Sequence, residues 1–210
     1  MGPDGCDNSG LSKIPGHTSI RLNARWFSRF KPLPMSSNLN IQVRPATVRD
    51  ARTIAEIHVN TWQVAYAGLV PDDHLKSLSV DKKQAKWLDA IKFSEPQVLV
   101  ALDGNAIVGF AGYDRSRDPK TKPTTGEIWA MYAAPDYWDE GVGLALWDGC
   151  REGLLEEGCT EVTLWVLLRN ERALRFYELA GFKRDMASAK TVPMGSGKVE
   201  EIRLKRSLAG

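Results

Sequence analysis

Two glycines stand at the start of a predicted helix in the stretch from Tyr137 to Leu146, YWDEGVGLAL. The first turn of a helix leaves backbone N–H groups unpaired at the positive end of the helix dipole, and such a place binds anions. Gly141 and Gly143 allow a ligand to approach these groups closely. The stretch is neither the GxGxxG of dinucleotide folds nor the GxxxxGK(S/T) loop, since Lys and Ser/Thr are missing. Alone, the glycines fit either a phosphate site or an ordinary tight turn.

A second motif runs from Asn170 to Phe182 and has the form N-x-x-A-x-x-F-Y-x-x-x-G-F. Together the two motifs resemble the GCN5-related N-acetyltransferase (GNAT) superfamily. The acetyl-CoA signature of that superfamily is Arg or Gln, two residues, Gly, one residue, then Gly or Ala. The resemblance extends over residues 41–204 and implies an enzyme that transfers the acetyl group of acetyl-CoA to an amine.

The resemblance also assigns the residues that would hold acetyl-CoA. The pyrophosphate would lie on the backbone of Glu140, Gly141, Val142, Gly143, Leu144 and Ala145. The pantetheine arm would run along a splayed strand formed by Met131, Tyr132 and Ala133, bonding to it as another strand does. Asn170 matches a position that meets this arm, and a backbone N–H near Met131 or Tyr132 would bind the thioester oxygen.

Acetyl transfer to an amine needs a base that removes the ammonium proton and an acid that protonates the departing thiolate. Tyr177 matches the family tyrosine near the thioester sulfur, so the resemblance makes it the acid. Glu127 is the candidate base, because several branches of the family use a glutamate at this place, often through water; an exposed carboxylate at a strand start fits equally well. His58 and His74 are alternatives, although the helical spacing of His58 favours a packing role.

The acceptor pocket in this superfamily lies between the first two helices, the fourth strand and the last strand pair. In this sequence those parts supply Tyr66, Trp129 and Trp62 as candidate substrate contacts. Trp62 has the spacing of the core face of its helix, which favours packing.

The sequence departs from the signature at Trp138, which stands where Arg or Gln is usual. Asp139 and Glu140 follow it, and a carboxylate close to a diphosphate costs about 1 kcal/mol per pair at a surface dielectric. Backbone donation survives if both side chains point to water. The dipole also favours acidic residues near a helix N-terminus.

Hydrophobic periodicity predicts the elements that position these residues. Strands are expected at 41–46, in a hairpin over 97–114 around Asp103-Gly104-Asn105, and at 127–134, 160–167, 182–185 and 200–204; helices are expected at 49–65, 81–91, 141–157 and 170–180. The predicted fold class is α/β, or α+β in three layers. It has a mixed, mostly antiparallel sheet of six to seven strands with helices on both faces, the GNAT-type acyl-CoA N-acyltransferase fold.

Length and composition bound the remaining expectations. The 210 residues suffice for one well-buried domain, expected at 39–206, with residues 1–38 as a disordered N-terminal extension. A net charge of +2 with interspersed signs argues against nucleic acid as the partner. We expect no metal and no membrane segment, because there is no CxxC spacing and no apolar run of about 20 residues. Three cysteines without such spacing favour a reducing, cytoplasmic setting.

The predicted function is therefore direct acetylation of a primary amine, with a small-molecule acceptor favoured by the aromatic TWQVAY stretch. Two alternatives stay open. One is acetylation of a protein N-terminal α-amine, as in ribosomal-protein acetyltransferases of the same superfamily. The other is a non-catalytic module that binds acyl-CoA. Members of the superfamily are frequently dimers, so a homodimer is compatible with the resemblance.

Overall fold

The computed structural model describes residues 40–119 and 121–208. The expected extension at 1–38 lies outside them. The helices are α1 (Ala51–Ala65), α2 (Asp72–Lys76), α3 (Val80–Phe93), α4 (Val142–Glu156) and α5 (Glu171–Leu179), with 3-10 turns η2 (Val48–Asp50) and η3 (Pro135–Tyr137). The strands are β1 (Ile41–Pro45), β2 (Gln97–Asp103), β3 (Ala106–Arg115), β4 (Thr125–Ala133), β5 (Glu161–Leu167), β6 (Lys183–Met194) and β7 (Gly197–Ser207).

The strands form one seven-stranded sheet in the order β1-β2-β3-β4-β5-β7-β6. Only β4 and β5 pair in parallel, and the other neighbours pair antiparallel. The predicted mixed, mostly antiparallel sheet is therefore confirmed. The hairpin between β2 and β3 turns at Gly104, whose φ of 58° is the left-handed conformation that glycine adopts without strain.

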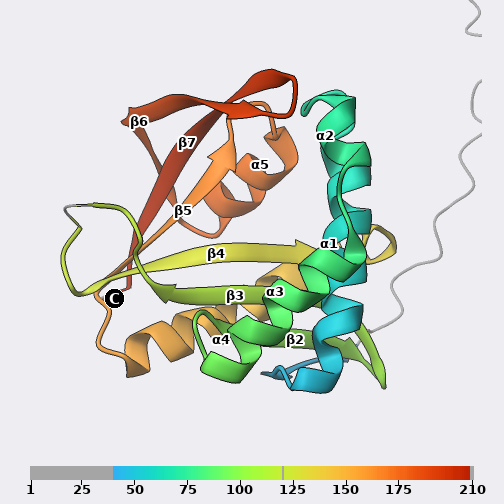
Figure 1. Cartoon of the computed structure of the whole chain (residues 1–210). Helices are drawn as coiled ribbons and strands as arrows, with labels where there is room; N and C mark the ends of the chain where they lie inside the picture. The colour runs from blue at the N-terminus through green and yellow to red at the C-terminus, as the bar shows by residue number, and fades with distance from the viewer. Residues whose placement is uncertain (1–39, 120, 209–210) are drawn as a thin grey trace, which may run out of the picture. The chain divides into compact units, whose positions relative to one another are not determined.

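The sheet has a hydrophobic core on each face. The larger core includes Leu146, Leu154 and Leu174 of α4 and α5, packed on alternate residues of β4, β5 and β7. On the opposite face, Ile54 and Trp87 of α1 and α3 pack on β2 and β3. Figure 1 shows α1 and α3 in front of β2 and β3, with α4 behind the sheet. The predicted coverage of both faces is confirmed.

Two boundaries differ from the sequence expectation. The last strand pair was expected at 182–185 and 200–204, but β6 and β7 run to Met194 and Ser207. Apolar alternation fades after residue 185 because β6 is an edge strand, exposed along most of its length, with a register shift between Asp185 and Lys190. The short helix α2 was not predicted, since five residues carry too little periodicity.

His58 lies inside the domain. It is 6% exposed and its ring packs among Trp62, Trp87, Phe110 and Tyr132. Its Nδ1 accepts a hydrogen bond of 3.1 Å from Trp87 Nε1, which leaves the proton of the neutral ring on Nε2. Desolvation, with Lys83 and Lys86 adding to it, lowers the pKa of His58 to about 3. The imidazole is thus a neutral packing group.

This burial predicts a pH dependence of stability. Between pH 6.5 and about 3, the unfolded chain binds a proton at His58 that the folded chain does not. The free energy of unfolding should therefore fall as the pH is lowered through this window, by up to about 1.4 kcal/mol per pH unit. A His58→Gln variant keeps an acceptor for Trp87 and should show a shallower decline in urea titrations from pH 7 to about 4. A decline as steep as that of the wild type would contradict this role.

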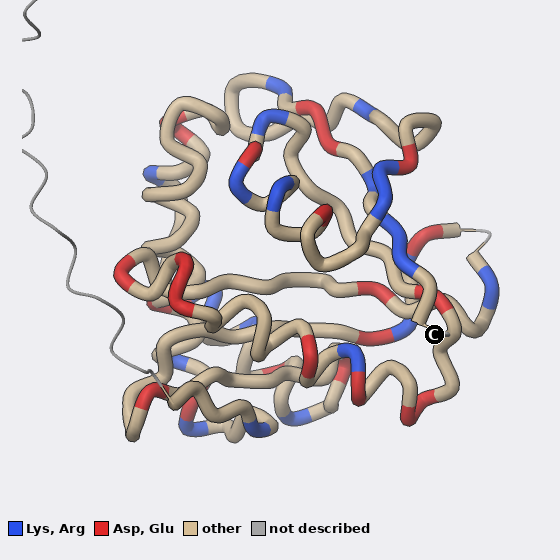
Figure 2. The backbone as a smooth tube through the Cα atoms, turned by 180° about the vertical axis from the view of Figure 1, so that it is seen from behind, with Lys and Arg blue, Asp and Glu red and all other residues tan. Residues whose placement is uncertain are grey.

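Three further observations concern the described residues. Cys150 and Cys159 are free and buried in the larger core. None of the helices in the described ranges is long and apolar enough to cross a membrane. Positions of both charge signs are interspersed along the backbone (Figure 2).

Candidate active site

The N-terminus of α4 presents free backbone donors. Gly141 precedes the helix with φ of 83°, and no side chain caps the first turn. The first helical hydrogen bond runs from Ala145 N to Gly141 O at 3.0 Å. The N–H groups of Val142, Gly143 and Leu144 lie before this bond and have no helical acceptor, so they and the dipole can receive an anion.

Gly143 lies in close contact with α5. A Cβ at this position would lie 3.2 Å from the ring of Phe176. This contact brings the first turn of α4 against the Phe176 ring of α5. The glycine that the signature explains by access to the cofactor is thus also explained by helix packing.

Next to α4, strands β4 and β5 separate. Their pairing extends from Thr125 with Glu161 only as far as Ile128 with Leu164, although β4 continues to Ala133. Figure 1 shows β5 diverging from β4 towards their C-terminal ends. The edge of β4 that faces β5 therefore lacks a strand partner over residues 129–133. The Ala133 carbonyl accepts from Thr61 and Trp138, and the remaining backbone groups of this edge can pair with an extended ligand.

A bulge accompanies this separation. Gly112 of β3 is opposite Ala130 and Tyr113 is opposite Ile128, so Trp129 has no partner across the pair. A bulge of this kind bends a strand and increases its twist. It lies where β4 leaves β5. Met131, Tyr132 and Ala133, which the resemblance assigned to the pantetheine arm, follow it directly.

Polar side chains from both faces of the sheet meet at this gap. Burial raises the pKa of Tyr66, while hydrogen bonds with Tyr132 and Asn170 act in the opposite direction. Burial also raises the pKa of Tyr177, and Tyr66 adds to this. Asn170 caps α5 by accepting the N–H of Ala173 at 3.2 Å. The structure thus brings Tyr66 and Tyr132, from the α1 side, together with Asn170 and Tyr177 from the α5 side.

Glu127 lies apart from this group, near the start of β4. Its side chain is 2% exposed and accepts hydrogen bonds from the Arg117 backbone N, at 2.8 Å, and from the Arg117 guanidinium. Arg117 also stacks over Trp129, with its Cζ 4.0 Å from the ring centroid. The expected exposed or solvent-linked carboxylate is instead a buried, ion-paired one, because the loop between β3 and β4 folds back over it.

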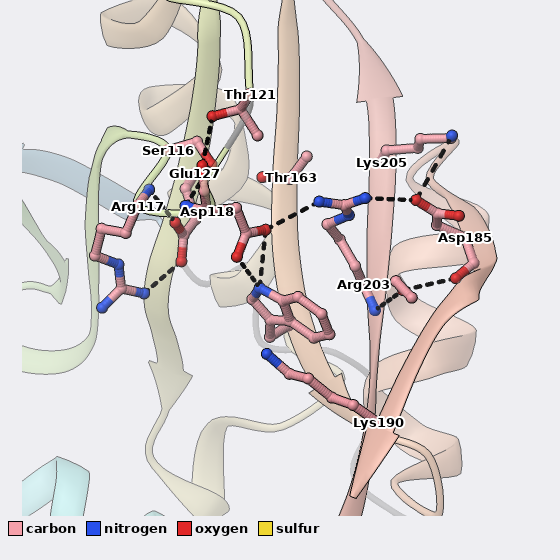
Figure 3. A network of polar contacts seen from close by, with 12 residues as sticks. Ser116, Arg117, Asp118, Thr121, Glu127, Thr163, Asp185, Lys190, Arg203 and Lys205 are labelled. Atoms are coloured by element: carbon pink, nitrogen blue, oxygen red, sulfur yellow. Dashed lines mark hydrogen bonds and ion pairs between the residues drawn. The ribbon is translucent and has the colours of Figure 1, made fainter. Parts of the chain in front are cut away.

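The same loop anchors a polar network on the face opposite α4 and α5 (Figure 3). Asp118 accepts from Trp165 Nε1 at 3.1 Å and from Arg203 at 3.2 Å. Arg203 also donates to Asp185 at 2.8 Å, and Lys190 lies 3.5 Å from the Trp165 ring centroid. The network links the loop to β5, β6 and β7, and it forms a charged, tryptophan-containing wall beside the gap.

The three predicted acceptor contacts fall in two places. Trp62 and Tyr66 form an edge-to-face pair with ring centroids 4.8 Å apart, next to Val70, Leu75 and Val199. Trp62 Nε1 is buried without a partner in the described structure. Trp129 is at the other end of the gap, beneath Arg117.

The acidic residues before Gly141 also have defined places. Asp139 has φ of 64° and accepts a hydrogen bond of 2.8 Å from Arg172, near the start of α5. The Arg172 guanidinium lies over the Trp138 ring, 4.0 Å from its centroid. Glu140 is exposed. The charge of Asp139 is balanced by Arg172, and Glu140 is exposed to solvent. Neither carboxylate therefore stands as an unpaired, buried charge beside the α4 amides.

Comparison with known proteins identifies the family. The profile of the Acetyltransferase (GNAT) family matches residues 54–182, which include the gap, the α4 start and α5. The chain belongs to the GNAT family. It is an acetyl-CoA-dependent N-acetyltransferase with acetyl-CoA as co-substrate, as predicted.

Individual GNAT relatives match about two thirds or more of this chain. An uncharacterized N-acetyltransferase of Bacillus subtilis is 31% identical over 139 residues, covering 66% of this chain and 78% of that protein. Spermidine N(1)-acetyltransferase of Thermoplasma acidophilum is 24% identical over 150 residues, covering 69% and 89%. The crystal structure of the PaiA N-acetyltransferase of T. acidophilum in complex with coenzyme A superimposes with a TM-score of 0.61 at 23% identity, covering 77% and 97%. This last likeness supports the fold.

Sequence reasoning missed three residues of this GNAT site: Arg117, Arg172 and Arg203. Each forms an ion pair with a residue of another segment: Arg117 with Glu127, Arg172 with Asp139, and Arg203 with Asp118. Of the three, only Arg172 could have been noticed in the sequence. It lies inside the second motif, while Trp138 replaces the usual Arg or Gln of the first motif.

Proposed function

We propose that this GNAT enzyme transfers the acetyl group of acetyl-CoA directly to the primary amine of a small molecule. The observation that carries the proposal is the gap between β4 and β5, with tyrosines from both sheet faces at its edges. The residues present fit acetyl-CoA. The α4 amides suit a diphosphate, and the unpaired edge of β4 suits the two amide groups of the pantetheine arm. Bound there, acetyl-CoA supplies an activated acetyl group as a thioester.

Tyr177 has the properties of the acid. Its pKa is raised by burial and by Tyr66, so its phenol is protonated at neutral pH and can donate to a thiolate at the gap. The backbone N–H of Met131, which the ladder with β3 leaves on the free edge of β4, would donate to the thioester oxygen. Asn170 would bond the pantetheine arm.

Glu127 is the proposed base. It precedes Met131 by four residues, about 13 Å along an extended strand, so a proton would reach it through water. The carboxylate accepts a charge-assisted hydrogen bond from the Arg117 guanidinium. The Arg117 contacts also fix the orientation of the carboxylate within the paired part of β4 and β5.

The acceptor would enter on the face that carries Trp62, Tyr66, Trp129 and the polar network. A small amine fits the aromatic contacts at both ends of the gap, because tryptophan and tyrosine faces attract cations. The spermidine-acetylating relative acts on such an amine. The domain itself is proposed at 39–206, in the cytoplasm.

A thiol-release assay tests this function. The protein with acetyl-CoA should release free thiol with a panel of small primary amines, including spermidine, and not with a peptide that offers only an N-terminal α-amine. The matched control is each amine with its amino group already acetylated. Release with the peptide alone would indicate an N-terminal acetyltransferase. Binding of acetyl-CoA without release from amine or peptide would indicate a non-catalytic module.

A further inference from the structure

We propose that Arg172 is the cation that binds the diphosphate of acetyl-CoA, and that Asp139 occupies its place until the diphosphate arrives. The inference rests on acetyl-CoA as co-substrate and assigns a residue that the signature loop does not contain. The usual Arg or Gln is replaced by Trp138, so the loop offers no cation of its own.

The placement follows from the packing of α5. Phe176 lies against Gly143, with ring atoms 3.2 Å from where a Cβ would be. Arg172 precedes Phe176 by four residues, and residues at this spacing share one face of a helix. Arg172 therefore projects from the face of α5 that meets the first turn of α4. Its bond to Asp139, two residues before Gly141, agrees with this placement.

The guanidinium is oriented but not saturated. The Trp138 ring covers one of its faces at 4.0 Å, which fixes the guanidinium plane. One donor, a terminal Nη2 N–H, is directed at Asp139 Oδ2 at 2.8 Å, and a guanidinium carries five N–H donors in all. The Arg172 side chain is 44% exposed, so a ligand can reach its remaining donors. Arginine in such a setting binds phosphate oxygens in a bidentate manner.

Asp139 matches the place of a temporary counter-ion. Its side chain is 90% exposed, so its bond to Arg172 is held at the surface, where a surface ion pair contributes little. Its carboxylate reaches Arg172 of α5, and its φ of 64° is one that Asp tolerates better than most residues. A diphosphate carries more charge than one carboxylate and would compete for the same donors. Although a carboxylate repels a phosphate, Asp139 thus keeps Arg172 positioned for the diphosphate until it binds.

Calorimetric titration of coenzyme A tests the proposal through two variants with opposite expected effects. Arg172→Gln should weaken coenzyme A binding about tenfold, because a charge-assisted bond is lost. Asp139→Asn keeps a residue that tolerates positive φ but removes the competing charge, so it should tighten binding about threefold. Arg184→Gln is the control. It removes one positive charge of β6, where Arg184 pairs with Glu178 near the C-terminal end of α5, and should leave affinity unchanged.

Two shortened probes locate the phosphate. Pantetheine, which lacks all phosphates, should bind wild type and Arg172→Gln equally. Dephospho-coenzyme A, which lacks only the 3′-phosphate, should show the same tenfold loss as coenzyme A. Weaker binding in both Arg172→Gln and Asp139→Asn would show that the pair only supports the loop and would overturn the proposal. A loss that disappears with dephospho-coenzyme A would overturn the diphosphate assignment. Failure of the wild type to bind coenzyme A would instead count against acetyl-CoA as co-substrate.

Discussion

Tyr177→Phe is expected to lower kcat about 100-fold while leaving the KM for acetyl-CoA nearly unchanged. The reason is that the variant loses only the hydroxyl that would protonate the thiolate. The ring keeps its packing against Phe176 and Phe182, with centroids 5.0 and 5.4 Å away. Steady-state kinetics with the best amine of the panel would measure both parameters.

Tyr113→Phe is the matched control for this loss. Tyr113 is also a buried tyrosine, 4% exposed, and its hydroxyl donates to Gln97 at 2.9 Å near Gly153, towards the C-terminal end of α4 and away from the α4 start. Losing that bond should cost about 1 kcal/mol of stability and no turnover. Equal kcat for Tyr177→Phe and the wild type would remove Tyr177 from the acid role.

The second large effect is expected at Glu127. Glu127→Gln should lower kcat/KM for the amine about 100-fold at neutral pH, because the ammonium proton loses its acceptor. The difference in kcat/KM between the variant and the wild type should shrink as the pH rises, since the amine is then deprotonated in solution without help from the enzyme. A pH profile of kcat/KM for wild type and variant would show two curves that converge at high pH.

Arg117→Gln separates the base role from a structural one. It leaves the carboxylate of Glu127 in place and removes its ion-pair partner. If Glu127 is the base, this variant should retain most of the neutral-pH activity that Glu127→Gln loses. If Glu127 only holds the loop between β3 and β4, both variants should lose activity together, with parallel falls in Tm and no convergence at high pH.

Much of the fold could be predicted from the sequence because the central elements carry strong periodic patterns. The helices α1 and α4 and the hairpin of β2 and β3 show them, with Gly104 marking the turn. The edge strand β6 could not be bounded in this way, since a strand exposed on both faces has no apolar alternation to read.

The candidate site likewise contains residues that local sequence patterns predict and residues that they do not. Gly141, Gly143, Asn170 and Tyr177 belong to local motifs, so their positions along the chain sufficed to single them out. The partners that set their electrostatics come from elsewhere in the chain. Arg117 reaches Glu127 through a returning loop, and Arg172 reaches Asp139 across the contact of two helices. Such contacts are set by tertiary packing, which no single-sequence spacing encodes.

The position of the cofactor is the central claim, and amide hydrogen exchange with and without acetyl-CoA tests it most directly. Within residues 129–133 of β4, the N–H groups that face the gap should exchange rapidly in the free protein, as should those of residues 142–144 at the α4 start, because these groups lack backbone acceptors. About 1 mM acetyl-CoA should slow exchange in both segments and leave β1 and β2 unchanged. Unchanged exchange in both segments at saturating acetyl-CoA, or protection confined to other elements, would contradict the account.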